Sequence, residues 1–167
     1  MEMTISQCLR RIAKLKGEMK ELLARAQQSV SYDEAAPPAF SFVDTMKEIE
    51  KTREELIKLE TLLRVTNAWT EFKFGGRTLS LAEATVILQE HKARIAWLKA
   101  LPCKAQAKTS SSKLDYDDEG ERVKVTVNTI CALPEAERAK QVKDTQEAFD
   151  ALNDVVENLN HKTPIRA

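Results

Sequence analysis

A group of polar side chains suited to holding an anion lies near the middle of the chain. Its members are Arg64, Thr66, Asn67, Thr70, Arg77 and Thr78. An arginine presents a rigid, planar fork of N–H donors that matches a phosphate or a carboxylate. Hydroxyl groups, a glycine turn and the start of a following helix would add donors around the same ion. We therefore expect this segment to bind a small anionic, nucleotide-like ligand, with Arg64, Asn67 and Arg77 as anchors.

The same residue types also occur where helices end, and this gives a second interpretation. Asn67 and Thr70 can cap the exit from a helix, while the two arginines pair with nearby glutamates. Polar residues at helix ends most often satisfy the free backbone groups there. Ligand binding and helix capping therefore both stay open at this point.

His91 and an acidic segment are the candidates for metal or ligand contacts elsewhere. His91 falls on an apolar row of a helix, where a packed histidine is typical, and contact with the ligand is the alternative. His161 is the only other histidine, so we expect no histidine-based metal site. Asp115, Asp117 and Glu119 superficially resemble a calcium loop, but Thr126 stands where its last glutamate belongs. We predict neither a metal nor a cofactor.

Signatures of catalysis are absent from the sequence. The chain has no Gly-x-Ser-x-Gly motif, no phosphate-binding loop and no His-Glu-x-x-His motif. Its carboxylates fall at positions predicted to face solvent, which gives no support for a tuned acid–base pair. Cys8, Cys103 and Cys131 form an odd set without metal or redox spacing, which indicates reduced thiols. We expect no catalytic residue and no enzymatic activity.

Apolar residues at seven-residue spacing predict the elements that position these side chains. The first helix has two such rows, one of Ile5, Ile12, Met19 and Ala26 and the other of Cys8, Leu15 and Leu22. Similar rows predict a helical hairpin over 4–67 and further helices over 80–101 and 134–160. The predicted fold is mainly α, a single domain over 1–167 with an antiparallel coiled-coil or four-helix arrangement. Because the apolar rows are narrow, we expect a homo-oligomer.

Two short β elements are predicted between these helices. Phe72 and Phe74 alternate with polar residues before Gly75 and Gly76, which predicts a β-hairpin over 70–79. Residues 103–120 are expected to form a polar loop. One additional short strand is predicted over 122–128, where valines alternate with polar residues, and we expect it to pair with the hairpin.

Composition limits the classes of partner. The 26 basic and 26 acidic residues cancel, which argues against a nucleic-acid binder. No stretch reaches the roughly 18 apolar residues of a membrane span, and the N-terminus lacks the features of a signal peptide. We therefore predict a cytoplasmic protein without a membrane partner. Trp69 and Trp97 are expected to pack in a core or an interface, with stacking on a base as the alternative.

Several stretches carry a resemblance to a known family. They are Leu63–Thr70, with its Arg, Thr-Asn and Thr, then Gly76-Arg77-Thr78-Leu79, and the Val-Lys-Val strand before a helix ending in Leu159-Asn160. Over nearly the whole chain the sequence resembles a little-characterised family of small bacterial and phage coiled-coil proteins, some labelled "septicolysin". Where the family often has Asn-Trp, this chain has Asn160-His161. The resemblance implies a helical fold and brings no assigned function.

Two classes of function follow. The first is a homo-oligomeric binding protein that holds a small anionic ligand, sequestering a nucleotide signal in the host cytoplasm if a phage encodes the chain. The alternative is a structural or adaptor protein that binds another protein through its helical seams.

Overall fold

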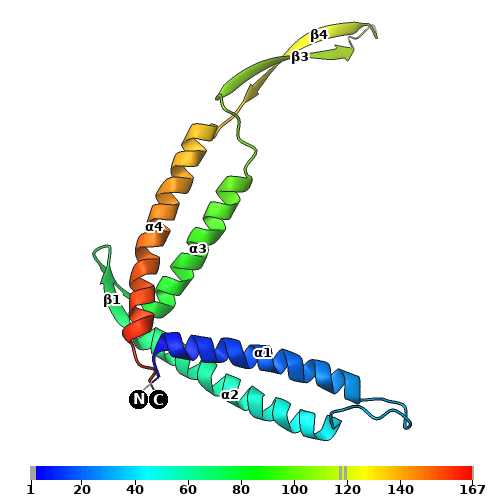
Figure 1. Ribbon diagram of the computed structural model, residues 1–167. Coiled ribbons are helices and arrows are strands. Elements are labelled where there is room, and N and C mark those ends of the chain that lie inside the picture. The colour runs from blue at the N-terminus through cyan, green and yellow to red at the C-terminus, as the bar shows by residue number, and fades with distance from the viewer. Residues whose placement is uncertain (1–2, 117, 119, 167) are drawn as a thin grey trace. The chain divides into compact units, whose positions relative to one another are not determined.

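The computed structural model describes residues 3–116, 118 and 120–166 (Figure 1). Along the chain its elements are α1 (Ile5–Ser29), α2 (Phe42–Trp69), β1 (Glu71–Phe74), β2 (Arg77–Ser80), α3 (Leu81–Ala100), β3 (Lys108–Tyr116), β4 (Arg122–Ile130) and α4 (Glu135–Lys162). They form two compact units. The first combines the chain up to Thr85 with the segment from Asp154, and the second is Val86–Asn153. Asp117 and Glu119 of the acidic segment lie outside the described residues.

The prediction of a mainly α, coiled-coil or four-helix fold is wrong. The described residues form four helices and two separate two-stranded antiparallel sheets, which is a mixed fold. The predicted polar loop over 103–120 contains the nine-residue strand β3. The strand predicted over 122–128 is part of β4, and it pairs with β3 rather than with the β1–β2 hairpin. β3 escaped prediction because its side chains are mostly Ser, Thr and charged residues, so it has no strong apolar alternation.

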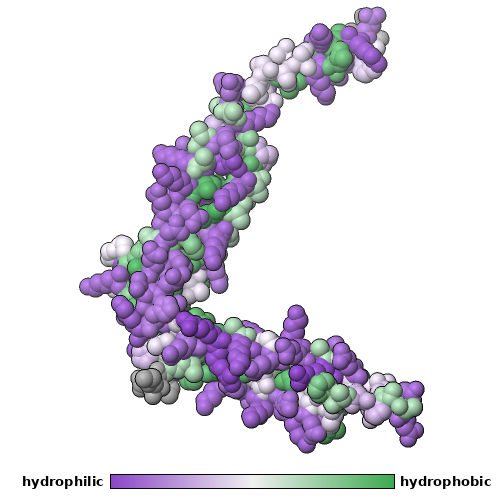
Figure 2. Space-filling view, in the orientation of Figure 1, coloured by the Kyte–Doolittle hydropathy of each residue, from purple (hydrophilic) through white to green (hydrophobic). Residues whose placement is uncertain are grey.

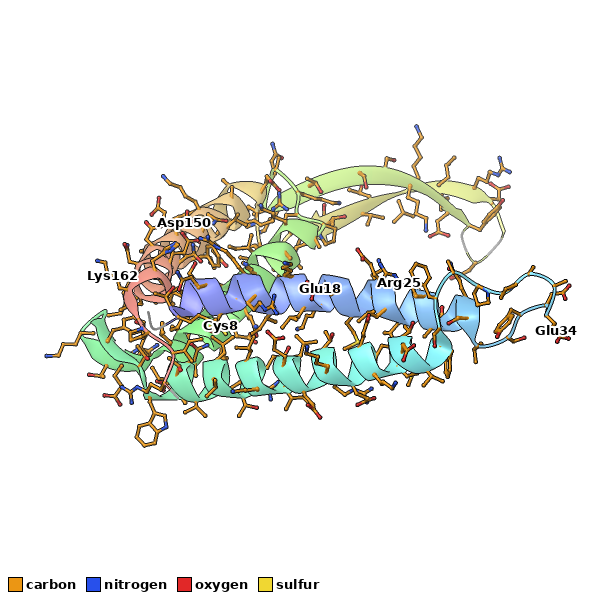
Figure 3. All side chains as sticks on the ribbon, turned by 60° about the horizontal axis from the view of Figure 1, so that its bottom comes forward. Cys8, Glu18, Arg25, Glu34, Asp150 and Lys162 are labelled. Atoms are coloured by element: carbon orange, nitrogen blue, oxygen red, sulfur yellow. The ribbon has the colours of Figure 1, made fainter. Side chains whose placement is uncertain are left out.

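α1 and α2 form the helical hairpin of the first unit, and the two helices lie side by side in Figures 1 and 3. The buried residues of α1 recur at spacings of three and four, except across the half-buried Met19, where the spacing is seven; they are Ile5, Cys8, Ile12, Leu15, Leu22, Ala26 and Ser29. Across from them α2 buries Thr45, Ile49 and Thr66. Two ion pairs join the helices at the surface, from Arg11 to Glu55 and from Lys16 to Glu60.

Capping residues fix where these helices begin. The Thr4 hydroxyl accepts a hydrogen bond from the Gln7 amide, and the Gln7 side chain accepts one from the Thr4 amide. This reciprocal pair is a capping box that satisfies two of the free donors at the start of α1. At the start of α2 the Ser41 hydroxyl accepts from the Asp44 amide in the same way.

Residues from the two ends of the described chain pair with each other in the first unit. Thr4 and Pro164 form an antiparallel bridge. The Ile5 amide donates to the Thr163 carbonyl, and the Ile165 amide donates to the Met3 carbonyl. The segment after α4 is therefore an integral part of the unit that α1 begins.

β1 and β2 form a tight hairpin after α2, with Phe72 opposite Leu79. The turn residues Gly75 and Gly76 have φ angles of 57° and 80°. Positive φ at both central positions is the requirement of a type I′ turn, which glycine meets at little cost. The Leu81 amide donates to the Thr70 carbonyl and so ties the start of α3 to the end of α2.

The second unit contains most of α3 and α4 and the β3–β4 hairpin (Figure 1). α3 buries Leu88, Ile95 and Leu98 here, and α4 buries Thr145 and Leu152. β3 and β4 pair over nine residues in a register that sets Lys108 opposite Ile130 and Tyr116 opposite Arg122.

Candidate functional site

Thr66 lies at the centre of the predicted ligand-binding segment and is a structural residue. Its side chain is fully buried. The hydroxyl donates to the Leu62 carbonyl at 2.8 Å and accepts from the Arg166 amide at 3.0 Å. Thr66 therefore fixes the last described segment of the chain against α2, and its hydroxyl has no capacity left to donate to a ligand.

Thr70 and Ser80 also serve helix ends. The Thr70 hydroxyl donates to the Thr66 carbonyl at 2.7 Å, which satisfies a carbonyl in the last turn of α2. Ser80 and Glu83 form a capping box at the start of α3: the Ser80 amide donates to the Glu83 carboxylate, and the Glu83 amide donates to the Ser80 hydroxyl. These hydrogen bonds hold the pKa of Glu83 below its ordinary value. For these residues the capping interpretation accounts for every contact.

The remaining members of the segment lie at the surface of the first unit. Arg64 on α2 and Arg77 and Thr78 on β2 are exposed, and Asn67 is half-buried. No hydrogen bond or ion pair within the described chain joins these four side chains to one another. The side-chain oxygen of Asn67 is buried without a hydrogen-bond partner among the described residues. An anionic group at this junction would have to bind to the two arginines, and the Asn67 oxygen could only accept from an N–H or O–H of the same ligand.

His91 belongs to α3 in the second unit, where it is half-buried. It lies on the same side of the helix as Leu88, Ile95 and Leu98, because these residues are spaced by three, four and seven positions. Packing and contact with a ligand therefore both remain predictions for His91.

The opposite face of α3 is apolar and exposed. Val86, Ala93, Trp97 and Ala100 recur at spacings of seven, four and three, which places them on one side of the helix. All four are exposed, Val86 to 58% and Trp97 to 60% of its surface. Only Gln89 and Glu90 interrupt the row with polar groups. We call these four residues the outer face of α3.

Side chains of α4 hold the other flank of α3. Arg138 donates to the carbonyls of Leu98 and Lys99 and pairs with Glu135, so it caps the C-terminal end of α3 from outside. The hydrogen bond to Glu135 raises the pKa of Arg138. The Lys92 ammonium lies 5.2 Å from the centre of the Phe149 ring. α4 therefore stabilises α3 from one side and leaves its outer face exposed.

The cysteine thiols and the side chains that could bind a metal offer little further chemistry. The three cysteines are free thiols, and burial raises the pKa of Cys8, which favours its unreactive protonated form. Within the described ranges no three or more His, Cys, Asp or Glu side chains converge as a metal site would require. Among the same residues no helix has both the length and the hydropathy needed to span a bilayer.

Comparisons with known proteins place the fold and nothing more. No family model matches the chain, and no curated protein matches its sequence. The structure is similar to the crystal structure of a functionally unknown conserved protein from Corynebacterium diphtheriae, with a TM-score of 0.78 over 99% of this chain and 100% of that one. The two sequences are 17% identical, so the likeness shows a shared fold.

Sequence reasoning missed the outer face of α3 because it assigned each helix a single apolar row. The signal was present: Val86, Ala93 and Trp97 repeat at helical spacing beside the row of Leu88 and Ile95. Arg138 could not be assigned to the end of α3 from spacing, since its contacts are about forty residues away along the chain. The Thr66–Arg166 hydrogen bond, 100 residues apart in sequence, is beyond sequence reasoning for the same cause.

Proposed function

We propose that this protein is a non-enzymatic adaptor that binds an amphipathic helix of another protein along the outer face of α3. The observation that supports this most is the exposed apolar row itself. A surface helix normally turns one apolar face inward and one polar face outward. α3 has apolar residues on both sides, and an exposed apolar row is a common sign of a protein-binding surface.

The residues of this row suit a helical occupant. Trp97 supplies a large side chain of the type that dominates binding energy when a partner covers it. Ala93 and Ala100 flank it with small side chains, so a second helix can approach the backbone of α3 closely. The spacing of Val86, Ala93, Trp97 and Ala100 follows one helix face for four turns, which matches the apolar stripe of a partner helix.

Site-specific photo-crosslinking in the source cells tests this proposal. A photoreactive residue at Ala93 should capture one discrete protein, and the same residue at Lys92, whose side chain faces Phe149 of α4, should not. Trp97→Asp should abolish the capture from Ala93, while Trp69→Asp, which changes an equally exposed tryptophan on α2, should leave it intact. Equal capture from Ala93 and Lys92, or capture that survives Trp97→Asp, would rule out the outer face as the docking site.

A small anionic ligand at the junction of α2, β2 and α3 is a second candidate, and a specific observation favours it. Arg64 and Arg77 make no salt bridge with any described residue, although each lies near enough to a carboxylate, Glu60 and Glu83 respectively, to lower its pKa. The buried oxygen of Asn67 lacks a partner and, as an acceptor, would take an N–H or O–H group of the ligand rather than its anionic group. Since the Thr66 hydroxyl bonds to Leu62 and Arg166 and the Thr70 hydroxyl caps α2, the ligand would rest on these three side chains and on Thr78. If a phage encodes the chain, a host nucleotide signal is the ligand class that this interpretation predicts.

Native mass spectrometry of freshly purified protein tests the second candidate. A phosphate-containing adduct that disappears from the Arg64→Ala/Arg77→Ala variant but not from an Arg10→Ala/Arg53→Ala variant would support it. All four arginines are surface residues of the first unit, so the two variants lose equal charge. An adduct that survives the first pair of substitutions would refute binding at this junction. Membership of the family labelled "septicolysin" and a cytoplasmic location remain predictions.

A further inference from the structure

The β3–β4 hairpin is a two-stranded ribbon with little packing on either face. Of its eighteen strand residues only Thr109, Val123 and Thr129 are even half-buried. Leu114, Tyr116, Val125, Val127 and Ile130 are all exposed by more than a third. Side chains project from both faces of the ribbon in Figure 3, and apolar residues show among polar ones on this arm in Figure 2. An isolated two-stranded ribbon is marginally stable in water, and further strands stabilise it.

The register of the β3–β4 pair fixes which backbone groups of β3 are left without a partner in the ribbon. The Cys131 amide donates to the Ala107 carbonyl, so residues 107 and 131 are a hydrogen-bonded pair. Hydrogen-bonded and non-hydrogen-bonded pairs alternate along an antiparallel ladder. The amides and carbonyls of Ser110, Ser112, Leu114 and Tyr116 therefore point away from β4, toward an open edge. In the single chain the Asp115 carboxylate accepts from the Tyr116 amide at this edge.

The two edges of the ribbon differ in charge. β4 carries only basic charges, Arg122 and Lys124, and lysine on an edge strand opposes pairing with another strand. β3 carries Lys108 at its first position and, further along, Lys113 and Asp115, two opposite charges placed symmetrically on either side of Leu114. An antiparallel strand that pairs with its own copy sets residues at equal distances from the centre opposite each other. Centred on Leu114, β3 is therefore complementary to itself.

We propose that β3 pairs with β3 of a second copy of this chain around a two-fold axis at Leu114. The result is a four-stranded antiparallel sheet in the order β4, β3, β3 of the second copy, β4 of the second copy. Ser112 and Tyr116 of each chain then face Tyr116 and Ser112 of the other, with roughly six new backbone hydrogen bonds. Lys113 of each chain lies opposite Asp115 of the other as a close, non-hydrogen-bonded pair.

Neighbouring registers are disfavoured by the same two charges. Centring the pair on Lys113 sets this lysine against its own copy, and centring it on Asp115 sets two carboxylates face to face. Like charges directly opposite destabilise a cross-strand pair. Centring on Ser112 places Lys113 opposite Ser111 and Asp115 opposite Thr109, so neither charge finds a partner.

A charge-exchange experiment on the full chain tests the register. Lys113→Asp creates two acidic residues that face each other in the pair, and Asp115→Lys creates two basic ones. By sedimentation equilibrium the wild-type chain should dimerise, and each variant alone should dimerise at least about tenfold more weakly. Mixing the two variants should restore a dimer with one chain of each, because every position 113 then lies opposite an unlike charge at 115. Lys124→Asp, on the other edge, should leave the wild-type dimer intact.

A cysteine placed on the axis tests the centre of symmetry independently. Leu114→Cys lies opposite itself with Cα atoms about 5.5 Å apart, a separation that a disulfide spans. Mild oxidation should therefore give a covalent dimer. Ser112→Cys, on the same face and edge, should not crosslink, since its copy lies four residues along the sheet, about 13 Å away.

Three results would overturn the proposal. They are a wild-type chain that stays monomeric at high micromolar concentration, variants that gain nothing on mixing, and Ser112→Cys that crosslinks as well as Leu114→Cys. The proposal is independent of the outer face of α3. Trp97→Asp should leave the dimer unchanged, and the charge variants should leave photo-crosslinking from Ala93 in place.

Discussion

The α1–α2 hairpin and the β3–β4 hairpin are both antiparallel pairs of elements that follow each other directly along the chain. α1 buries seven side chains against α2 and its surroundings. β3 and β4 bury none to the same degree, although their ladder extends over nine residue pairs. Two hairpins of similar plan therefore depend on different interactions within one chain.

The difference comes from where each element finds hydrogen-bond partners for its backbone N–H and C=O groups. A helix forms its hydrogen bonds internally, so α1 and α2 need each other only for their apolar side chains. A strand forms them with neighbours, so a two-stranded ribbon always leaves two edges unpaired. The helical hairpin is complete as a pair, whereas the ribbon is a partial sheet that more strands can extend.

Replacing one leucine by alanine in each hairpin should give the largest difference in the free energy of unfolding. Leu15 is 1% exposed and Leu114 is 62% exposed. Leu15→Ala should lower the free energy of unfolding by roughly 2–5 kcal/mol, because it removes buried methyl groups and leaves a cavity. Leu114→Ala should cost less than about 0.5 kcal/mol in dilute, monomeric protein. Urea denaturation followed by circular dichroism measures both, and equal losses would contradict the comparison.

The next largest loss of stability is expected from removing the buried hydroxyl of Thr66 in the first unit. Thr66→Val should cost roughly 1–3 kcal/mol, because it removes both hydrogen bonds of a fully buried hydroxyl, the one to the Leu62 carbonyl and the one from the Arg166 amide. Thr52→Val is the matched control, since its hydroxyl bonds only to the Glu48 carbonyl one turn away and is largely accessible to water. Thermal unfolding of the two variants should differ clearly. A Thr66→Val protein as stable as Thr52→Val would show that the last segment is not held by this contact.

The cap at the start of α2 should contribute less. Ser41→Ala removes the hydroxyl that accepts from the Asp44 amide, and loss of such a cap costs about 1 kcal/mol. Ser111→Ala changes the same residue type in β3, where no cap exists, and should be neutral in the monomer. The midpoints of urea unfolding test this: Ser41→Ala should lower the midpoint, and Ser111→Ala should leave it unchanged.

The smallest effect is a dependence on pH that belongs to the helical hairpin. The hydrogen bond and charge of Lys16 hold the pKa of Glu60 below its ordinary value of 4.5. The ionised carboxylate thus stabilises the folded chain above that value, and the contribution is lost as the pH falls through the lowered pKa. Glu60→Gln should therefore flatten the decrease in melting temperature on acidification. Glu54→Gln, an exposed position on the same helix, should keep the wild-type slope.

The two hairpins also differ in how much of their structure could be predicted from the sequence. The row from Ile5 to Ala26 and the Gly75–Gly76 turn carry local signals, so the helical hairpin and the β1–β2 hairpin were accessible. β3 was missed because its residues are mostly Ser, Thr and charged and show no apolar alternation, whereas its partner β4, equally exposed, has alternating valines. At the candidate site Thr70 bonds to the end of α2, as the capping alternative has it, whereas the oxygen of Asn67 has no partner among the described residues. Ligand binding at Arg64, Asn67, Arg77 and Thr78 remains a prediction. Contacts such as Thr66 with Arg166 depend on the folded chain and leave no pattern in the sequence.

The bridge between Thr4 and Pro164 also bears on how the chain reaches its fold during synthesis. The second unit is an insertion within the first, so a ribosome releases all of Val86–Asn153 before the residues that complete the first unit. α1 and α2 can meet early, as neighbours in sequence. The partners of Met3 and Ile5, however, emerge only after α4. We expect a nascent chain arrested before Thr163 to hold a paired helical hairpin whose N-terminal turn is frayed and open to proteases until the last segment arrives.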